Sequence, residues 1–216
     1  MIACILFGNM CSGKTTVGRL LAHGGDHVVV SAKDAVARNL AAAGDEVKAL
    51  RAKGYLLPDP VITGWVMGAA EAEIAAGRKV ILDGFPRTAT QAQGLIDAHG
   101  SSAAVIDCAC PPAVLLRRFA HRVLCEDCEM PCSRAFEDFD GTCPLCGSTR
   151  FAPRPTDRPD YLDVKTRQFD EVSSKVLPVL RGARMRVLPV SDHARFAALR
   201  ATVSSLHERL GQPHGH

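Results

Sequence analysis

The first residues that could do chemistry form a glycine-rich loop near the start of the chain. Gly8 to Thr15 reads GNMCSGKT, which fits G-x-x-x-x-G-K-[ST], and it lies between an apolar run and a helical pattern. Its backbone N–H groups can face a phosphate, Lys14 can reach the outer phosphates, and the Thr15 hydroxyl can join a Mg²⁺ shell. An ordinary glycine turn is the alternative. The context favours nucleoside triphosphate binding by Asn9, Met10, Cys11, Ser12, Gly13, Lys14, Thr15 and Thr16.

A second polar segment follows a later apolar run. It reads Asp83-Gly84-Phe85-Pro86-Arg87-Thr88, and Gln91 comes shortly after it. Ligands of open α/β sheets bind outside the carboxyl ends of the strands. Asp83 is placed there to hold Mg²⁺ through water, and Arg87 to make a bidentate contact with a phosphate. Taken alone, the same residues could also be a turn with a surface arginine.

Four of the nine cysteines form two Cys-x-x-Cys pairs, Cys125 with Cys128 and Cys143 with Cys146. Each pair can supply two ligands to a tetrahedrally coordinated ion, and four thiolates leave no open position for a substrate. The spacing therefore predicts a structural zinc site, which would replace the hydrophobic core that so short a segment lacks. Two disulfides or idle thiols are the alternatives. Cys132 lies nearby as a spare thiol.

Apolar runs and helical patterns alternate along the rest of the chain. The expected strands are Ile2–Phe7, Val28–Val30, Val80–Leu82, Ala103–Ile106 and Met185–Pro189. The expected helices are Lys14–His23, Asp34–Ala42, Asp45–Ala52, Asp59–Ala76, Thr88–Ala98, Pro111–Ala120, Asp160–Leu180 and His193–Leu210. This order predicts an α/β fold with a doubly wound, five-stranded parallel sheet. Residues 123–157 do not follow this alternation of strands and helices, and we interpret them as an insertion.

Bulk composition excludes several classes of function. The formal net charge is +3, and the insertion carries more acidic than basic residues, which argues against a nucleic-acid partner. No apolar run approaches the roughly 20 residues that span a bilayer, so we expect no membrane association. The N-terminus lacks the basic segment of a secretory signal, so we expect a cytoplasmic protein.

Together these motifs resemble adenylate kinases and related nucleoside monophosphate kinases over nearly the whole chain. Asp83-Gly84-Phe85-Pro86-Arg87-Thr88 with Gln91 resembles the family signature D-G-F-P-R-T-x-x-Q. The resemblance implies that the glycine loop binds ATP and that Arg87 and Gln91 hold AMP. The segment Gly54–Asp59 resembles the family's G-x-L-V-P-D, whose backbone and apolar side chains face the adenine. The acceptor contacts expected on this basis are Tyr55, Leu56, Leu57, Gly84, Phe85, Pro86, Arg87 and Gln91.

Further arginines match the same family. Arg118 and Arg122 resemble a pair at the hinge of a lid, where they contact ATP and the transferring phosphate. Arg154 and Arg167 resemble two arginines that close on the phosphates from beyond the lid. The expected catalytic set is therefore Lys14, Arg87, Arg118, Arg122, Arg154 and Arg167. Zinc-lidded members of the family resemble the arrangement of the four cysteines.

One stretch departs from the family pattern. The usual S-T-G-D-x-x-R becomes Ser31-Ala32-Lys33-Asp34-Ala35-Val36-Ala37-Arg38, so the arginine comes one residue late. We include Ser31, Ala32 and Arg38 among the expected AMP contacts. A shift of one residue on a helix turns a side chain by about 100°, however, so two alternatives stay open. Either Lys33 compensates, or the acceptor is a monophosphate other than AMP.

The resemblance implies a P-loop NTPase-like core, with a zinc-binding lid inserted in it. We expect the core at 1–122 and 158–216, a monophosphate-binding segment at 31–59 and the lid at 123–157. The expected reaction is reversible transfer of the ATP γ-phosphate to AMP, with Mg²⁺ held at Thr15 and Asp83, in a monomer. The alternatives are a kinase for another nucleoside monophosphate, a small-metabolite kinase, and a module whose zinc ribbon binds nucleic acid.

Overall fold

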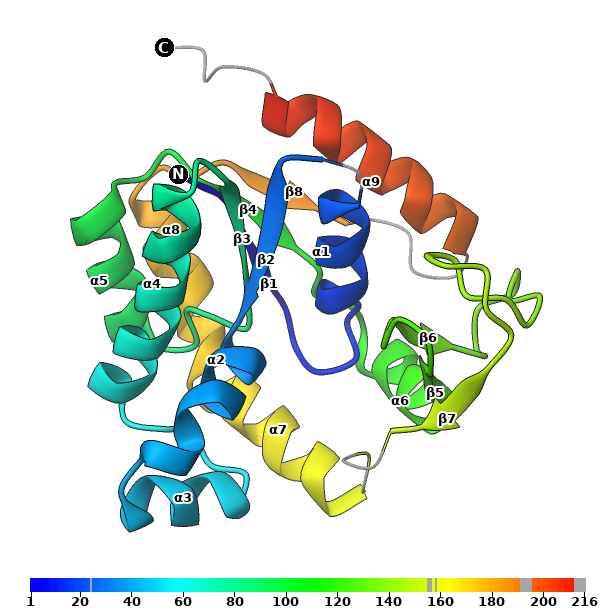
Figure 1. Ribbon diagram of the computed structural model, residues 1–216, viewed down its shortest axis with the longest axis horizontal. Helices are drawn as coiled ribbons and strands as arrows, with labels where there is room; N and C mark the ends of the chain where they lie inside the picture. Colours follow the sequence, from blue (N-terminus) through cyan, green and yellow to red (C-terminus); the bar gives the residue numbers. More distant parts are fainter. Residues whose placement is uncertain (24, 155–156, 158, 191–195, 212–216) are drawn as a thin grey trace.

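A five-stranded parallel sheet lies at the centre of the molecule, in the strand order β2-β3-β1-β4-β8 (Figure 1). The computed structural model describes residues 1–23, 25–154, 157, 159–190 and 196–211. The sheet strands are β1 (Ile2–Phe7), β2 (His27–Ser31), β3 (Lys79–Asp83), β4 (Ala104–Asp107) and β8 (Val187–Pro189). The position of β1 between β3 and β4 brings the phosphate loop next to the end of β3.

Helices cover both faces of this sheet. The described residues form the helices α1 (Lys14–Ala22), α2 (Ala32–Asn39), α3 (Asp45–Ala52), α4 (Asp59–Ala75), α5 (Ala89–His99), α6 (Pro112–Ala120), α7 (Pro159–Glu171), α8 (Val176–Gly182) and α9 (Phe196–Gly211). Short 3₁₀ turns lie at Leu40–Ala42 and Ser173–Lys175. Helices α4, α5 and α8 cover one face, and α1 and α9 cover the other (Figure 1).

Successive side chains of β1 point to opposite faces of the sheet. Ile5 and Phe7 of β1 pack into the core beneath α4, α5 and α8, whereas Cys4 and Leu6 pack beneath α1 and α9. Successive side chains of a strand point to opposite faces of a sheet, so a strand buried on both sides is apolar throughout. This is why Ile2–Phe7 reads as an unbroken apolar run.

The predicted α/β fold with five parallel strands is confirmed, and so are most element positions. Helix α2 begins at Ala32, earlier than predicted, because the Ser31 hydroxyl accepts hydrogen bonds from the N–H groups of Lys33 (3.1 Å) and Asp34 (3.4 Å). The single helix predicted for Asp160–Leu180 is wrong: it divides into α7 and α8 around the 3₁₀ turn. The predicted start of the last helix, at His193, lies outside the described residues.

The insertion forms a small sheet of its own. Strands β5 (Arg122–Cys125), β6 (Pro131–Ser133) and β7 (Phe151–Pro153) pair antiparallel in the order β6-β5-β7. A separate apolar cluster lies beneath it, formed by Val123, Cys125, Met130, Cys132 and Cys143. Because this cluster is small, we expect that additional cross-links hold the insertion in shape.

Candidate active site

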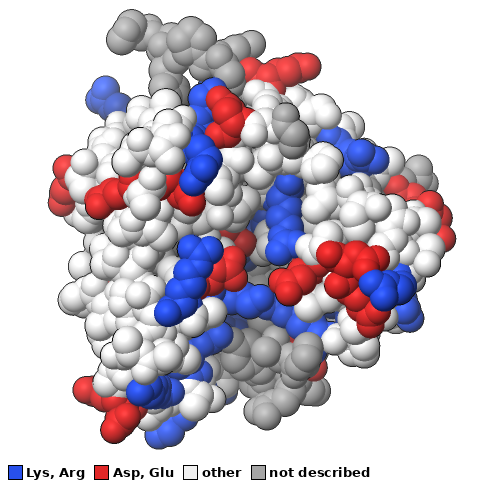
Figure 2. Space-filling model, in the orientation of Figure 1, with Lys and Arg blue, Asp and Glu red and all other residues white. Residues whose placement is uncertain are grey.

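A cavity of about 560 Å³ opens between the carboxyl edge of the main sheet and the insertion. In Figure 2, Lys and Arg side chains lie along a hollow that separates the insertion from the rest of the molecule. The phosphate loop, the end of β3, the start of α2, residues 55–57, and parts of α6, the insertion and α7 all line the cavity. It thus gathers segments that lie far apart in the sequence.

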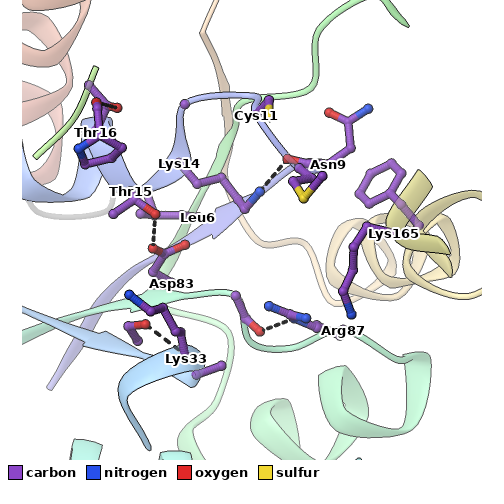
Figure 3. A pocket seen from close by; sticks show the side chains of 18 of the residues that line it. Leu6, Asn9, Cys11, Lys14, Thr15, Thr16, Lys33, Asp83, Arg87 and Lys165 are labelled. Carbon is purple, nitrogen blue, oxygen red and sulfur yellow. Dashed lines mark hydrogen bonds between the residues drawn. The ribbon is translucent and has the colours of Figure 1, made fainter. Parts of the chain in front are cut away.

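The glycine loop bends tightly around Lys14. Gly8 has a φ of 141°, and a Cβ atom there would lie 2.8 Å from Ser12 Oγ and 3.1 Å from the Cys108 carbonyl carbon. Gly13, at a φ of 99°, directly precedes α1 and has no side chain to cap it, so the first N–H groups of the helix stay available to an anion. Lys14 Nζ donates to the Asn9 carbonyl at 2.6 Å (Figure 3). Burial lowers the pKa of Lys14, although Asp83 opposes this effect.

A hydroxyl and a carboxylate meet beside this loop. Thr15 Oγ1 donates to Asp83 Oδ2 at 2.7 Å (Figure 3). Asp83 ends β3 and is 7% exposed, so its carboxylate is almost removed from bulk water. A hydroxyl and a carboxylate are oxygen ligands of the type that Mg²⁺ takes, alongside phosphate oxygens and water. The pair therefore fits a magnesium ion that arrives with a nucleotide.

A hydrogen-bond network fixes the segment that follows β3. Arg87 Nε donates to the Gly84 carbonyl at 2.7 Å, and the backbone N–H of Arg87 donates to Gln91 Oε1 at 2.7 Å. The Asp59 carboxylate accepts from Gln91 Nε2 and from Thr88 Oγ1, each at 2.7 Å. Asp59 therefore joins the start of α4 to the start of α5, and it holds Gln91 where that side chain lines the cavity.

Three arginines reach the cavity from the side of the insertion. Arg118 is 6% exposed, donates to the Ser12 carbonyl at 2.9 Å, and lies with its guanidinium carbon 4.9 Å from the centre of the Phe136 ring. Arg122 forms a bidentate pair with Asp157, with Nε donating to Oδ2 at 2.6 Å. Arg154 lines the same cavity. Together with Lys14 and Arg87 they place five cationic side chains along the cavity.

Most of the predicted site residues come together here. The described cavity lining contains Asn9, Met10, Cys11, Gly13, Lys14, Thr15, Thr16, Ser31, Ala32, Tyr55, Leu56, Leu57, Asp83, Gly84, Pro86, Arg87, Gln91, Arg118, Arg122 and Arg154. Ser12 and Phe85 are buried behind it. Arg38 and Arg167 are exposed, and neither is among the described residues that line the cavity.

Further cations line the cavity, and of those named here only Lys33 was considered from the sequence, as a possible replacement for Arg38. Lys33 on α2, Arg51 on α3 and Lys165 on α7 all line the cavity. Arg51 and Lys165 match none of the motifs used to pick the site, so the prediction missed them. No local pattern of residues distinguishes Lys165, because its contact with Gly54 joins residues 111 positions apart.

The four paired cysteines converge in the insertion. The Sγ atoms of Cys125, Cys128, Cys143 and Cys146 lie within 4.8 Å of one another. Cys125 and Cys146 are 3.5 Å apart and Cys128 and Cys143 are 3.6 Å apart, so neither pair is a disulfide. Four sulfurs bound to zinc at about 2.3 Å in a tetrahedron would be about 3.8 Å apart. The cluster therefore fits a four-thiolate ion, and Cys132 lies outside it.

The comparisons with known proteins agree with this geometry. A family model described as AAA domain (AAA_33) matches residues 4–138. The adenylate kinase of Zymomonas mobilis is 29% identical over 81% of this chain and 82% of its own length. That of Limosilactobacillus fermentum is 32% identical over 72% of this chain and 76% of its own. That of Enterococcus faecalis is 34% identical over 68% of each. The chain therefore belongs to the adenylate kinase family of nucleoside monophosphate kinases, ATP-dependent phosphotransferases built on a P-loop core.

Proposed function

We propose that this protein transfers the γ-phosphate of Mg-ATP to AMP, reversibly, to give two ADP. The observation that carries the proposal is the pairing of two phosphate-binding segments at one cavity. Strands β1 and β3 are neighbours, and Leu6 of β1 lies in register with Asp83 of β3. The loop around Lys14 and the segment around Arg87 therefore open side by side, as transfer between two phosphates requires.

The donor side would be held by the glycine loop. Lys14 and the first N–H groups of α1 would bind the outer phosphates of ATP, with Asn9 to Thr16 wrapped around them. Thr15 and Asp83 would hold the magnesium ion of Mg-ATP, Asp83 in part through water. When bound, that ion neutralises charge that develops on the phosphate oxygens. Arg118 of α6 and Phe136 of the insertion would flank the ATP.

The acceptor side would be held by the segment after β3 and by residues 31–59. Arg87 would take the acceptor phosphate, and the Asp59 network would keep Gln91 in place for the base. The apolar segment Tyr55 to Leu57 would face the adenine, and Ser31 and Ala32 would close the same side. The acceptor is already an anion, so the reaction needs no general base, and Arg122 and Arg154 would stabilise the transferring group.

The insertion would act as a lid held in shape by zinc. Four thiolates complete a tetrahedron, so such an ion would support structure and would not bind substrate. We assign 123–157 to this lid, 1–122 and 158–216 to the core, and 31–59 to a monophosphate-binding segment. Closure of the lid and of that segment would exclude water, which could otherwise take the phosphate.

We also propose a cellular setting and an oligomeric state for this protein. Among the described residues, no helix is both long and apolar enough to cross a bilayer. All nine cysteines are free thiols, which is consistent with a reducing compartment, and we propose the cytoplasm. The family resemblance is the basis on which we propose a monomer.

A second candidate is a kinase for a different nucleoside monophosphate. It is favoured by the altered stretch Ser31–Arg38, where Arg38 is exposed and Lys33 lines the cavity in its place. Product analysis separates the two candidates: purified protein receives Mg-ATP with AMP, GMP, CMP, UMP or dTMP, each in its own reaction. ADP formation with AMP alone supports the first proposal. Faster turnover of another monophosphate supports the second, and no turnover with any of them refutes both.

A further inference from the structure

Lys165 occupies a position in the acceptor half of the cavity that no sequence motif marks. Its side chain is partly buried, lines the cavity and points from α7 toward Arg87 (Figure 3). Its Nζ donates to the Gly54 carbonyl and, at 3.0 Å, to Gln168 Oε1. Gln168 Nε2 also donates to the Gly54 carbonyl, at 3.2 Å. Helix α7 is thus joined to the turn between α3 and α4 through two side chains.

The turn that Lys165 contacts leads directly into a segment that lines the cavity. Gly54 is buried, has a φ of 78° and opens the segment whose residues Tyr55, Leu56 and Leu57 line the same cavity. The Lys165 ammonium therefore lies between the segment proposed to face the acceptor base and the Arg87 guanidinium proposed to take the acceptor phosphate. A nucleoside monophosphate that spans these two places would pass within reach of Lys165.

The charges around Lys165 indicate what it would bind. Burial, followed by the nearby charges of Arg87 and Arg51, lowers the pKa of Lys165 to about 8. Arg51 comes from α3, Arg87 from the segment after β3, and Gln168 from α7 itself, while Gly54 supplies a carbonyl from the turn. Three cationic side chains in one partly buried space repel one another, and a bound phosphate would offset that repulsion.

We propose that Lys165 and Arg51 bind the acceptor phosphate together with Arg87, and that Lys165 is the phosphate-binding cation of α7. This inference rests on the proposed function, because it assumes that a monophosphate occupies this half of the cavity. It replaces the expected role of Arg167, which lies on the same helix but is exposed and is not among the described lining residues.

Lysine in this place has a consequence that arginine would not have. Lys165 is protonated below about pH 8 and loses its charge above it, whereas an arginine stays charged throughout. The phosphate of a nucleoside monophosphate has its second pKa near 6, so its own charge is constant at alkaline pH. Affinity for the acceptor should therefore fall as the pH rises from 7 to 9.5.

The test measures the KM for AMP and for ATP, and AMP binding by calorimetry, at pH 7 and pH 9.5. For the wild-type protein we expect the KM for AMP to rise about tenfold between these pH values, with a smaller change for ATP.

Lys165→Met should raise the KM for AMP at pH 7 by about 10- to 100-fold, the effect of losing a hydrogen bond to a charged group. Lys165→Arg should restore AMP binding and remove the rise at pH 9.5. Arg51→Ala should raise the KM for AMP about tenfold.

Lys175→Met is the matched control, because Lys175 is an exposed lysine that lies outside the proposed binding segments. It should leave both KM values unchanged. An unchanged KM for AMP in Lys165→Met, or a loss of AMP binding in Arg167→Gln that matches it, would overturn the inference while the proposed function stands. Binding of AMP that depends on Lys165 without any transfer would support the inference and refute the proposed function. Failure to bind AMP, GMP, CMP, UMP or dTMP would overturn both.

Discussion

At the scale of single residues, the site depends on a few groups that the backbone holds in place. Gly8 sits so close to the Cys108 carbonyl carbon and Ser12 that a side chain there would force the loop open. Cys11 has a φ of 63°, a left-handed conformation that is uncommon for residues other than glycine. Such a conformation costs on the order of 1 kcal/mol and persists only where the surroundings fix it. The loop is therefore shaped before any phosphate arrives.

The first prediction concerns the lysine at the centre of this loop. Lys14→Met removes the only side-chain cation that the loop itself carries. We expect kcat to fall by about 100-fold or more, since charge on the transferring phosphate is stabilised chiefly by such groups. Steady-state kinetics with a coupled ADP assay measures the loss, and circular dichroism checks the fold. Lys175→Met, at an exposed lysine beyond α7, is the control and should retain full activity. Near-normal kcat in Lys14→Met would contradict the assigned role.

At the scale of elements, the apolar cluster of the insertion is small, so we expect the insertion to need a further cross-link to fold. Its sheet has two strands of three residues and one of four, above a cluster that includes two of the paired cysteines. Arg122 is the first residue of β5, and Cys125 is the last residue of the same strand. Any ion bound by the cysteines would therefore stabilise the strand that carries a proposed catalytic arginine.

The second prediction follows from this shared strand. We expect one zinc ion per chain by mass spectrometry, and removal by a chelator or by Cys143→Ser should lower kcat at least tenfold. Binding of structural zinc contributes about 10–16 kcal/mol in small domains, so the insertion should lose its fold without the ion. The core has separate apolar clusters and should keep its helical circular dichroism. Cys132→Ser is the control for metal content, because Cys132 lies outside the cluster. Full activity in a metal-free protein would refute a structural role.

The positions of helices and strands were predicted most accurately where a local pattern of residues determines them. The five core strands were found because strands buried on both faces are continuous apolar runs. The break between α7 and α8 was missed because residues 172–175 contain no Pro or Gly, and the buried Ser173 lies at the turn. The strands of the insertion are too short to show a period. Lys165 was missed for a different reason: its place depends on Gly54, which is 111 residues away in the sequence.

At the scale of the whole molecule, hydrogen bonds join the insertion to two helices of the core. Thr16 Oγ1 of α1 donates to the Pro131 carbonyl at 3.2 Å, and Arg19 Nη1 of α1 donates to the Cys128 carbonyl at 2.5 Å. The Asp138 carboxylate accepts from the Ala197 N–H at 2.7 Å, at the start of α9. A carboxylate is favoured at a helix N-terminus, because the N–H groups there lack partners within the helix. The proposed lid is thus docked on α1 and α9, the helices of one face of the sheet.

The last prediction tests whether this docking helps to bind ATP. Arg19→Met combined with Asp138→Ala removes two of these hydrogen bonds, each to or from a charged group. The docked state should become less populated, so we expect the KM for ATP to rise about 10-fold or more, while the KM for AMP stays near its original value. Steady-state kinetics with each nucleotide varied in turn provides the comparison. Glu126→Ala, at an exposed acidic residue of the insertion, should change neither constant. Equal rises in both KM values would show that the contacts stabilise the whole fold and do not favour ATP binding in particular.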